Sequence, residues 1–287
     1  MIPPAFDYVR PGSVAEAVAA LAARDEAKLL AGGQSLLQLL RLRLSFPSVL
    51  VDLGRVDELR GVREEAGELV VGAMTTHADV ASSELVRSRC GLLAAAAATI
   101  GDPAVRHRGT IGGSLAHADP AGDLPAVAVA LDATLVAAGS SGSRSIQARD
   151  FFTDFLSTAL EPDEVLVEVR VPVLGEGWGY RYEKFHRVAQ AWPVVGVATA
   201  VRRSDGQIAE ARIGLTNMGS TPVRATAAEQ AFAGVAVSDS AAIGRAADQA
   251  AVGASAPSDL HGKSDYREHL ARVLTRRAVI AAAGPAA

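Results

Sequence analysis

The sequence of 287 residues contains one cysteine, few aromatic side chains and no concentration of positive charge. Cys90 alone can neither form a disulfide within the chain nor supply the four thiolates of an iron–sulfur cluster. Aromatic residues make up 5% of the sequence. The 28 lysines and arginines are scattered in ones and twos and leave a formal charge of −4. Without a basic stripe, nucleic acid is not expected as a partner.

Long apolar runs are absent as well. No run approaches the roughly 18 residues that a membrane-spanning helix needs. The opening residues, MIPPAFDYVRPGS, lack the basic start and the apolar centre of a secretory signal. Apolar residues nevertheless make up 49% of the chain, enough for a substantial core. These features predict a soluble cytoplasmic protein without a membrane span.

The hydrophobic pattern predicts a mixture of helices and strands. Residues 13–16 have the form of a helix-capping box, in which Ser13 and Glu16 satisfy amides at the start of a helix. Apolar residues at helical spacing predict helices that follow this box and that cover 36–44, 76–87, 90–99, 240–251 and 265–283. Alternating or short apolar runs predict strands at 28–31, 49–53, 68–72, 133–138, 164–172, 192–202 and 209–216.

The pattern of predicted strands and helices changes after the segment GEGWG, at 175–179, which suggests a domain boundary near Leu174. We therefore expect one domain at 1–174, in two parts of about 1–55 and 56–174, and a second domain at 175–287. No internal repeat of 20 to 50 residues is visible.

Two glycine segments share one pattern of residues. Adjacent glycines let the backbone approach a ligand closely, and successive free amides form a concave donor site for phosphate oxygens. A single such segment is most simply a tight turn, whereas two of them suit a diphosphate. The first segment consists of Ala31, Gly32, Gly33, Gln34 and Ser35, and the second of Thr110, Ile111, Gly112, Gly113 and Ser114.

Common nucleotide and catalytic motifs are not matched. Neither segment has the Gly-x-Gly-x-x-Gly spacing of a dinucleotide-binding turn. Residues 261–264 end like a P-loop, but Pro257 stands where the earlier glycine belongs. Residues 112–116 resemble a nucleophile elbow whose closing glycine is replaced by Ala116. The six histidines show no paired ligand spacing, so a metal site is not expected.

The segment GDPAVRHRGTIGGSLAHADPAGDLP, at 101–125, closely resembles the FAD-binding medium subunit of molybdenum hydroxylases, a family that includes carbon monoxide dehydrogenase and xanthine dehydrogenase. Residues 31–35 are similar to the first flavin loop of that family. Residues 6–8, 182–185, 266–267 and 274–278 extend the resemblance over the chain. It implies an α+β protein, in which a two-part FAD-binding domain of the PCMH type precedes a smaller α+β C-terminal domain with a short antiparallel sheet.

The resemblance also implies how FAD is held. The pyrophosphate would lie between the two glycine segments, with their backbone amides as donors. Asp123 matches the family carboxylate that binds flavin sugar hydroxyls, or else it serves as a turn or helix-cap residue. His117 either lines the flavin or caps the turn.

Three further positions carry two interpretations each. Leu166 falls where the family places an apolar residue against the cofactor, although it also fits an inward strand residue. Lys184 could approach the adenine or a phosphate, or it could be a solvated surface lysine. Trp192 could lie near the isoalloxazine ring, but the run Gln190-Ala191-Trp192 departs from relatives that carry an acidic residue there.

The function implied is that of an FAD-carrying electron-transfer subunit of a heterotrimeric molybdenum hydroxylase. A large subunit would hold the molybdenum cofactor and a small subunit the iron–sulfur clusters, in a dimer of heterotrimers. NAD⁺, a quinone, a carrier protein or oxygen would reoxidise the flavin. The alternatives are a self-sufficient FAD-dependent oxidoreductase with its own small-molecule substrate, and a scaffolding protein that has lost flavin.

Overall fold

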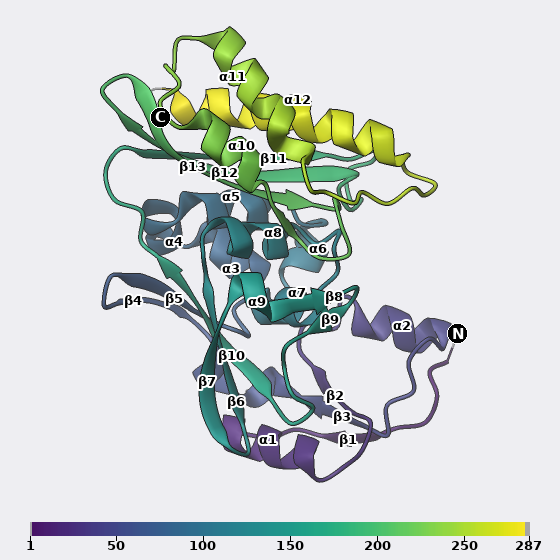
Figure 1. Ribbon diagram of the computed structural model, residues 1–287. Helices are drawn as coiled ribbons and strands as arrows, with labels where there is room; N and C mark the ends of the chain where they lie inside the picture. The colour runs from purple at the N-terminus through teal and green to yellow at the C-terminus, as the bar shows by residue number, and fades with distance from the viewer. Residues whose placement is uncertain (1, 285–287) are drawn as a thin grey trace.

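The computed structural model describes residues 2–284 and arranges them in three parts, stacked from the N-terminal strands to the C-terminal helix (Figure 1). Mixed helix and sheet confirm the α+β fold class. None of the helices within residues 2–284 combines the length and apolar character that a membrane crossing requires.

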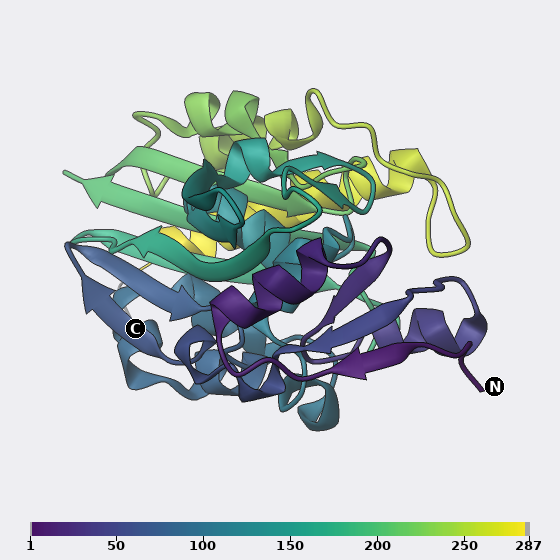
Figure 2. The same cartoon turned by 90° about the horizontal axis from the view of Figure 1, so that it is seen from below.

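The N-terminal part is a small parallel sheet with two helices, seen from below in Figure 2. Its strands lie in the order β1 (Asp7–Val9), β3 (Val49–Asp52), β2 (Ala27–Leu30). Ser13 caps helix α1 (Val14–Ala22), and its hydroxyl accepts from the Glu16 amide at 3.2 Å. Glu16 in turn accepts from the Gly12 amide at 2.7 Å, so the predicted cap forms. Helix α2 (Leu36–Leu42) follows β2 and extends away from the sheet.

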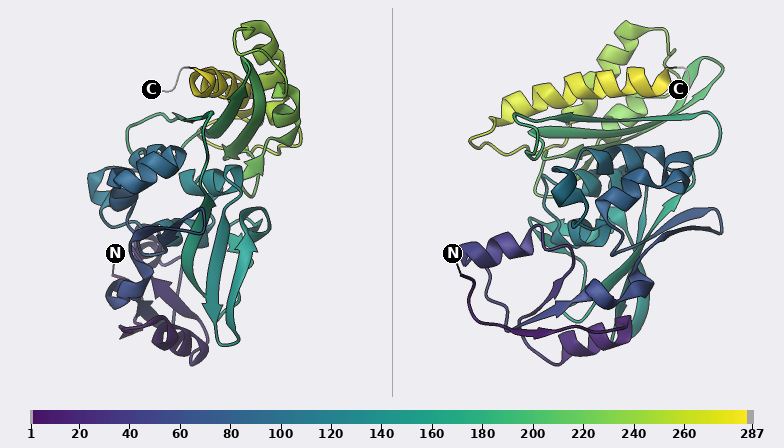
Figure 3. Two further views of the ribbon diagram at one scale, coloured as in Figure 1. Left: turned by 90° about the vertical axis from the view of Figure 1, so that its left-hand side faces the viewer. Right: turned by 180° about the vertical axis from the view of Figure 1, so that it is seen from behind.

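The central part is a five-stranded antiparallel sheet with helices packed beside it (Figure 3). The strand order is β4 (Val62–Glu65), β5 (Glu68–Gly72), β10 (Val165–Pro172), β6 (Thr134–Gly139), β7 (Gly142–Gln147). The helices are α3 (His77–Ser82), α4 (Glu84–Arg89), α5 (Gly91–Ala98), α6 (Pro103–Arg106), α7 (Ile111–His117), α8 (Asp123–Ala130) and α9 (Ala148–Phe151). The short pair β8 (Phe152–Asp154) and β9 (Ser157–Thr158) and the 3₁₀ turns Leu53–Arg55 and Asp57–Leu59 complete it.

The expectation of one helix over 76–87 was wrong, because two helices cover this stretch. The Ser83 hydroxyl accepts from the Val86 amide at 3.3 Å and thereby caps α4. Serine competes with helical backbone bonds in this way, so it favours a helix start over a helix interior.

The C-terminal part is the antiparallel sheet that the family resemblance implies. Its strands are β11 (Trp178–Phe185), β12 (Val195–Ser204), β13 (Gln207–Thr216) and β14 (Val223–Arg224). Helices α10 (Thr226–Phe232), α11 (Ser240–Ala247) and α12 (Ser264–Ala283), with the 3₁₀ turn Asp248–Ala251, accompany them. Helix α12 covers one face of this sheet, and α5 and α8 of the central part pack on the other (Figure 1).

Because helices cover both faces of this sheet, the strand β12 lacks the usual alternation of buried and exposed residues. Residues 195–201 of β12 are all buried, and apart from Thr199 none of them is polar. Gly214 shows how closely α8 approaches: a Cβ atom at this position would lie 2.1 Å from the Ala126 carbonyl oxygen. The C-terminal sheet is therefore packed directly on the central helices.

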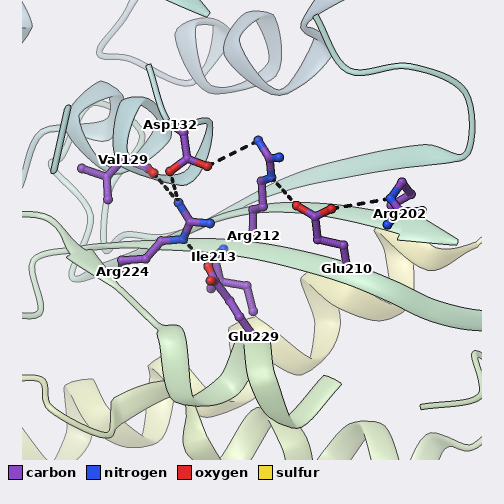
Figure 4. A network of polar contacts seen from close by, with 8 residues as sticks. All are labelled: Val129, Asp132, Arg202, Glu210, Arg212, Ile213, Arg224 and Glu229. Carbon is purple, nitrogen blue, oxygen red and sulfur yellow. Dashed lines mark hydrogen bonds and ion pairs between the residues drawn. The ribbon is translucent and has the colours of Figure 1, made fainter. Parts of the chain in front are cut away.

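An ion-pair network crosses the same junction (Figure 4). Arg224, on β14, donates to Asp132 at 2.8 Å and to the Val129 carbonyl at 2.7 Å, both just after or within α8, and it pairs with Glu229 on α10. Arg212 reaches the same Asp132 at 3.4 Å. The network ties the end of α8 to the C-terminal part.

We expect Arg224→Met to lower the free energy of unfolding by about 2–3 kcal/mol, because the largely buried Glu229 loses its cationic partner. Urea unfolding measures the change. Arg202→Met is the matched control, since the Arg202 side chain is 42% exposed and lies 3.5 Å from Glu210, and we expect it to cost under about 1 kcal/mol. Equal losses in the two variants would contradict a special role for Arg224.

Candidate functional site

The two predicted glycine segments lie in direct contact. A Cβ atom at Gly32 would stand 2.1 Å from the Arg108 carbonyl oxygen and 2.7 Å from the Gly109 Cα atom, immediately before the second segment. A Cβ atom at Gly113 would stand 3.4 Å from the Cβ atom of Ala31. Segments that are at least 75 residues apart in the chain (35 to 110) thus form one surface, and only glycine permits this approach at position 32.

The first segment presents unused backbone donors. It connects β2 to α2, and Gly33 adopts a left-handed φ of +74°. Within residues 2–284, the amides at 32–35 find no hydrogen-bond acceptor, and the Ser35 hydroxyl makes no capping bond to α2. Consecutive free amides at the start of a helix attract an anion, because their partial positive charges converge.

The second segment differs from the loop that the sequence suggested. Thr110 caps α7, and its hydroxyl accepts from the Gly113 amide at 3.1 Å. The Gly112 amide donates to the Ala73 carbonyl at 2.8 Å, and the Ser114 amide donates to the Thr110 carbonyl at 3.0 Å. These amides already have acceptors, so this segment offers a close surface and the Ser114 hydroxyl, while the free amide donors belong to the first segment.

Asp123 and Lys184 form a buried ion pair. Lys184, on β11, donates to one carboxylate oxygen of Asp123 at 2.8 Å and to the Thr99 carbonyl at 3.1 Å. The Tyr182 hydroxyl donates to the other carboxylate oxygen at 2.5 Å. The side chains of Asp123 and Lys184 are 4% and 5% exposed, so Lys184 is not a solvated surface lysine. Asp123 is the first residue of α8 and makes no capping bond.

Burial is the largest influence on the pKa values of Asp123 and Tyr182. Loss of solvent raises the pKa of Asp123, and the neighbouring ammonium group of Lys184 opposes that rise. Burial and the adjacent carboxylate also raise the pKa of Tyr182 well above its ordinary value, so this phenol stays protonated and donates.

The remaining predicted residues divide into buried and exposed positions. Leu166, on β10, is buried in the central core with Leu115 and Leu124, as an inward strand residue would be. His117 ends α7, is partly exposed, and its side chain makes no hydrogen bond within residues 2–284, so it does not cap the turn. Trp192 is 66% exposed, in the connection between β11 and β12.

The connection that carries Trp192 is anchored at both ends. The Gln190 side-chain amide donates to a carboxylate oxygen of Asp102 at 2.7 Å, and Asp102 also caps α6, which leads into the second glycine segment. The Asn217 side-chain amide donates to the Pro193 carbonyl at 3.0 Å. An acidic residue at position 190 would place a second carboxylate against Asp102, whereas the glutamine amide can donate to it.

Three residues near this connection carry roles that the sequence did not indicate. Tyr182 lies within a segment of family resemblance, yet no motif marks it as the donor to Asp123. Asn217 has a left-handed φ of +63°, which asparagine tolerates, and its backbone amide donates to the Pro120 carbonyl at 2.7 Å. Arg267 is fully buried and donates to the Val194 carbonyl and to Asp259.

Within residues 2–284, no three His, Cys, Asp or Glu side chains are grouped to hold a metal ion. Burial raises the pKa of the Cys90 thiol to about 12, which makes it unreactive. Burial also lowers the pKa of His77 to about 4, so the imidazole behind Gly109 is neutral at physiological pH.

Two protein families match consecutive stretches of the chain. The family described as the FAD binding domain in molybdopterin dehydrogenase matches residues 4–174, and the CO dehydrogenase flavoprotein C-terminal domain matches residues 180–282. The chain belongs to the FAD-binding medium subunits of molybdenum hydroxylases. The predicted resemblance is therefore confirmed, and this medium subunit is an FAD-binding oxidoreductase component.

Relatives support the assignment over the full length. The carbon monoxide dehydrogenase medium chain of Hydrogenophaga pseudoflava is 44% identical over 98% of both chains. The subunit alpha of the 6-hydroxypseudooxynicotine dehydrogenase complex of Paenarthrobacter nicotinovorans is 39% identical over 96% of this chain and 94% of its own. The solved structure of quinoline 2-oxidoreductase from Pseudomonas putida 86 superposes with a TM-score of 0.94, at 38% identity, over 99% of this chain and 98% of its own.

We expect Lys184→Met to lower the free energy of unfolding at pH 7 by about 3–5 kcal/mol, because it leaves the Asp123 carboxylate buried without a counter-charge. Losing the ammonium group raises the pKa of Asp123 further. A carboxyl group whose pKa is raised by folding holds more protons in the folded state, so its ionisation costs stability as pH rises through that pKa. The deficit therefore shrinks at acid pH.

Urea unfolding of Lys184→Met at several pH values tests this expectation. Lys28→Met is the control, because Lys28 is exposed on β2 and forms no ion pair within residues 2–284, and it should change stability by under about 0.5 kcal/mol. A deficit that stays the same at all pH values would show that Asp123 is not the affected group.

Proposed function

We propose that this medium subunit holds the pyrophosphate of FAD against the first glycine segment and relays electrons inside a heterotrimeric molybdenum hydroxylase. The observation that carries this proposal is the run of free amides at 32–35 in contact with the second glycine segment. When bound, FAD supplies the redox chemistry, in which electrons are taken up and released singly or in pairs. The residues present fit such a cofactor, because an uncharged donor cradle is what a diphosphate requires.

The other predicted residues complete the proposed site. The hydroxyls of Ser35 and Ser114 add donors for phosphate oxygens. Asp123 keeps acceptor capacity for sugar hydroxyls beyond the bonds from Tyr182 and Lys184. In this proposal Leu166 and Trp192 contribute apolar surface, and His117 lies at the end of α7. The remaining cofactor-binding residues are Ala31, Gly32, Gly33, Gln34, Thr110, Ile111, Gly112 and Gly113.

The redox centres that reduce the flavin belong, in this proposal, to other chains. Cys90 is the only cysteine, so no cysteine-ligated cluster can form on this subunit alone. Relatives are named as a medium chain or as a subunit of a complex, which supports the electron-transfer role over a self-sufficient oxidoreductase. We propose a large molybdenum-cofactor subunit and a small iron–sulfur subunit as partners, in a cytoplasmic dimer of heterotrimers.

We also propose that the chain divides functionally near Leu174, into a flavin-binding domain at 1–174 and a C-terminal domain at 175–287. The buried pair of Asp123 and Lys184 would then join the two domains. A distinct core supports this division, because buried residues of β12, β13, α10, α11 and α12 form a cluster of their own.

Absorbance spectroscopy and mass spectrometry of the released cofactor test the proposal on the purified chain, alone and with its partner subunits. Flavin bands, released FAD and co-purification with two unlike chains are the expected results. A colourless preparation in the presence of both partners would refute FAD binding. A substrate-active enzyme of this chain alone would refute the subunit role.

We expect Gly32→Ala to lower FAD affinity by about five- to 150-fold, because a methyl group 2.1 Å from the Arg108 carbonyl oxygen must push the two segments apart at a cost of about 1–3 kcal/mol. Fluorimetric titration with FAD measures the affinity. Gly175→Ala is the control, since nothing lies within 4 Å of a Cβ atom there. Unchanged affinity in Gly32→Ala would place the pyrophosphate elsewhere.

A further inference from the structure

A short stretch after β5, residues 73–77, forms a backing segment for the second glycine segment. It pairs with residues 109–112 in antiparallel direction. Three backbone hydrogen bonds of 2.8, 2.9 and 3.0 Å join the two stretches. One of them, at 2.9 Å, runs from the His77 amide to the Gly109 carbonyl. The start of the second glycine segment is therefore laid against the backing segment as in a strand ladder.

The backing segment is itself held by the central part. The Ala73 amide donates to the Val167 carbonyl on β10 at 2.9 Å, and the Met74 amide donates to the Leu59 carbonyl at 2.7 Å. Its backbone is thus fixed on two sides before it meets the second glycine segment.

The imidazole of His77 is packed against Gly109. A Cβ atom at Gly109 would lie 2.8 Å from the Cδ2 atom of this ring and 3.0 Å from its Nε2 atom. His77 is 4% exposed, and its Nδ1 atom has no hydrogen-bond partner within residues 2–284. Burial, together with the nearby Arg106 cation, lowers the pKa of His77 to about 4, so the ring is neutral at physiological pH. The ring therefore acts on Gly109 through its volume and not through its charge.

Gly109 also meets the first glycine segment. Its Cα atom would lie 2.7 Å from a Cβ atom at Gly32, beside the run of free amides at 32–35. The His77 ring and Gly32 thus contact the same residue. Protein interiors are close-packed, so removal of the ring leaves a space toward which Gly109 can move, and its contact with Gly32 then changes.

We propose that His77 is a positioning residue for the cofactor: its ring, packed against Gly109, sets how closely the backbone before the second glycine segment approaches Gly32. The contact in turn holds the free amides at 32–35 where they meet the pyrophosphate. The proposal rests on the proposed function, because it concerns the same donor surface.

A double-variant cycle tests the proposal on the full-length chain with its partner subunits. We expect His77→Ala to weaken FAD binding about tenfold in a fluorimetric titration, because Gly109 loses its support. Gly109→Ala should cause a similar loss, because its methyl group would lie 2.8 Å from the ring. The backbone at Gly109 is not left-handed, so alanine adds only that methyl group.

The double variant is the decisive member of the cycle. The methyl group at position 109 occupies part of the space that the ring vacates, so we expect at least about fivefold tighter FAD binding than two independent losses would give. Losses that simply multiply would overturn the proposal.

Ile243→Ala separates positioning from a general loss of stability. Ile243 lies on α11 in the core of the C-terminal part and is 1% exposed, so its truncation also removes buried volume. We expect it to lower the free energy of unfolding and to leave FAD affinity unchanged. An equal loss of affinity in Ile243→Ala and His77→Ala would show that His77 acts through stability alone.

Hydrogen exchange measures the same positioning without FAD. The amides at 111 and 112 donate to the carbonyls at 75 and 73 of the backing segment, at 3.0 and 2.8 Å. We expect both amides to exchange at least about tenfold faster in His77→Ala than in Ile243→Ala, because the loss of the ring loosens this pairing locally. Equal exchange rates in the two variants would overturn the proposal.

The two proposals can fail separately. Unaltered FAD affinity in His77→Ala, with FAD bound by the parent complex, would uphold the proposed function and refute the role of His77. A parent complex that binds no FAD would refute the proposed function, and hydrogen exchange alone would then decide whether His77 sets the contact between the two glycine segments.

Discussion

The buried ion pair of Asp123 and Lys184 is the interaction that holds the C-terminal part against the central part. It joins the first residue of α8 to β11, out of contact with solvent. A buried pair is retained only where further hydrogen bonds satisfy its remaining atoms, and here Tyr182 and the Thr99 carbonyl do so. Asp123 is also a predicted cofactor-binding residue. The junction of the central and C-terminal parts therefore lies at the proposed flavin site.

Close backbone contact is the second constraint. The first glycine segment approaches the backbone before the second so closely that a side chain at Gly32 has no room. The same requirement recurs where α8 meets the C-terminal sheet at Gly214. Small residues thus permit two contacts, one that forms a donor surface and one that brings the C-terminal sheet onto the central helices.

The connection between β11 and β12 joins two segments that lie far apart in the chain. It is anchored to Asp102 through Gln190 and to Asn217 through Pro193. Asp102 belongs to the segment that leads into the second glycine motif, and Asn217 to the end of β13. A residue change in this connection therefore acts both on the segment before the second glycine segment and on the end of β13.

Local pattern determined much of this protein. The capping box at Ser13, the alternating strand at 165–172 and the apolar run of β12 follow from spacing alone, and the segment at 101–125 identified the family. The sequence did not reveal that the second glycine segment is a helix start with its amides already bonded, because its acceptors at Ala73 and Thr75 lie far away in the chain. Only the tertiary structure brought Lys184 and Tyr182 to Asp123 and Arg267 to Asp259. These pairings depend on how sheets and helices pack, and burial, which no local pattern specifies, decides which charges remain ionised.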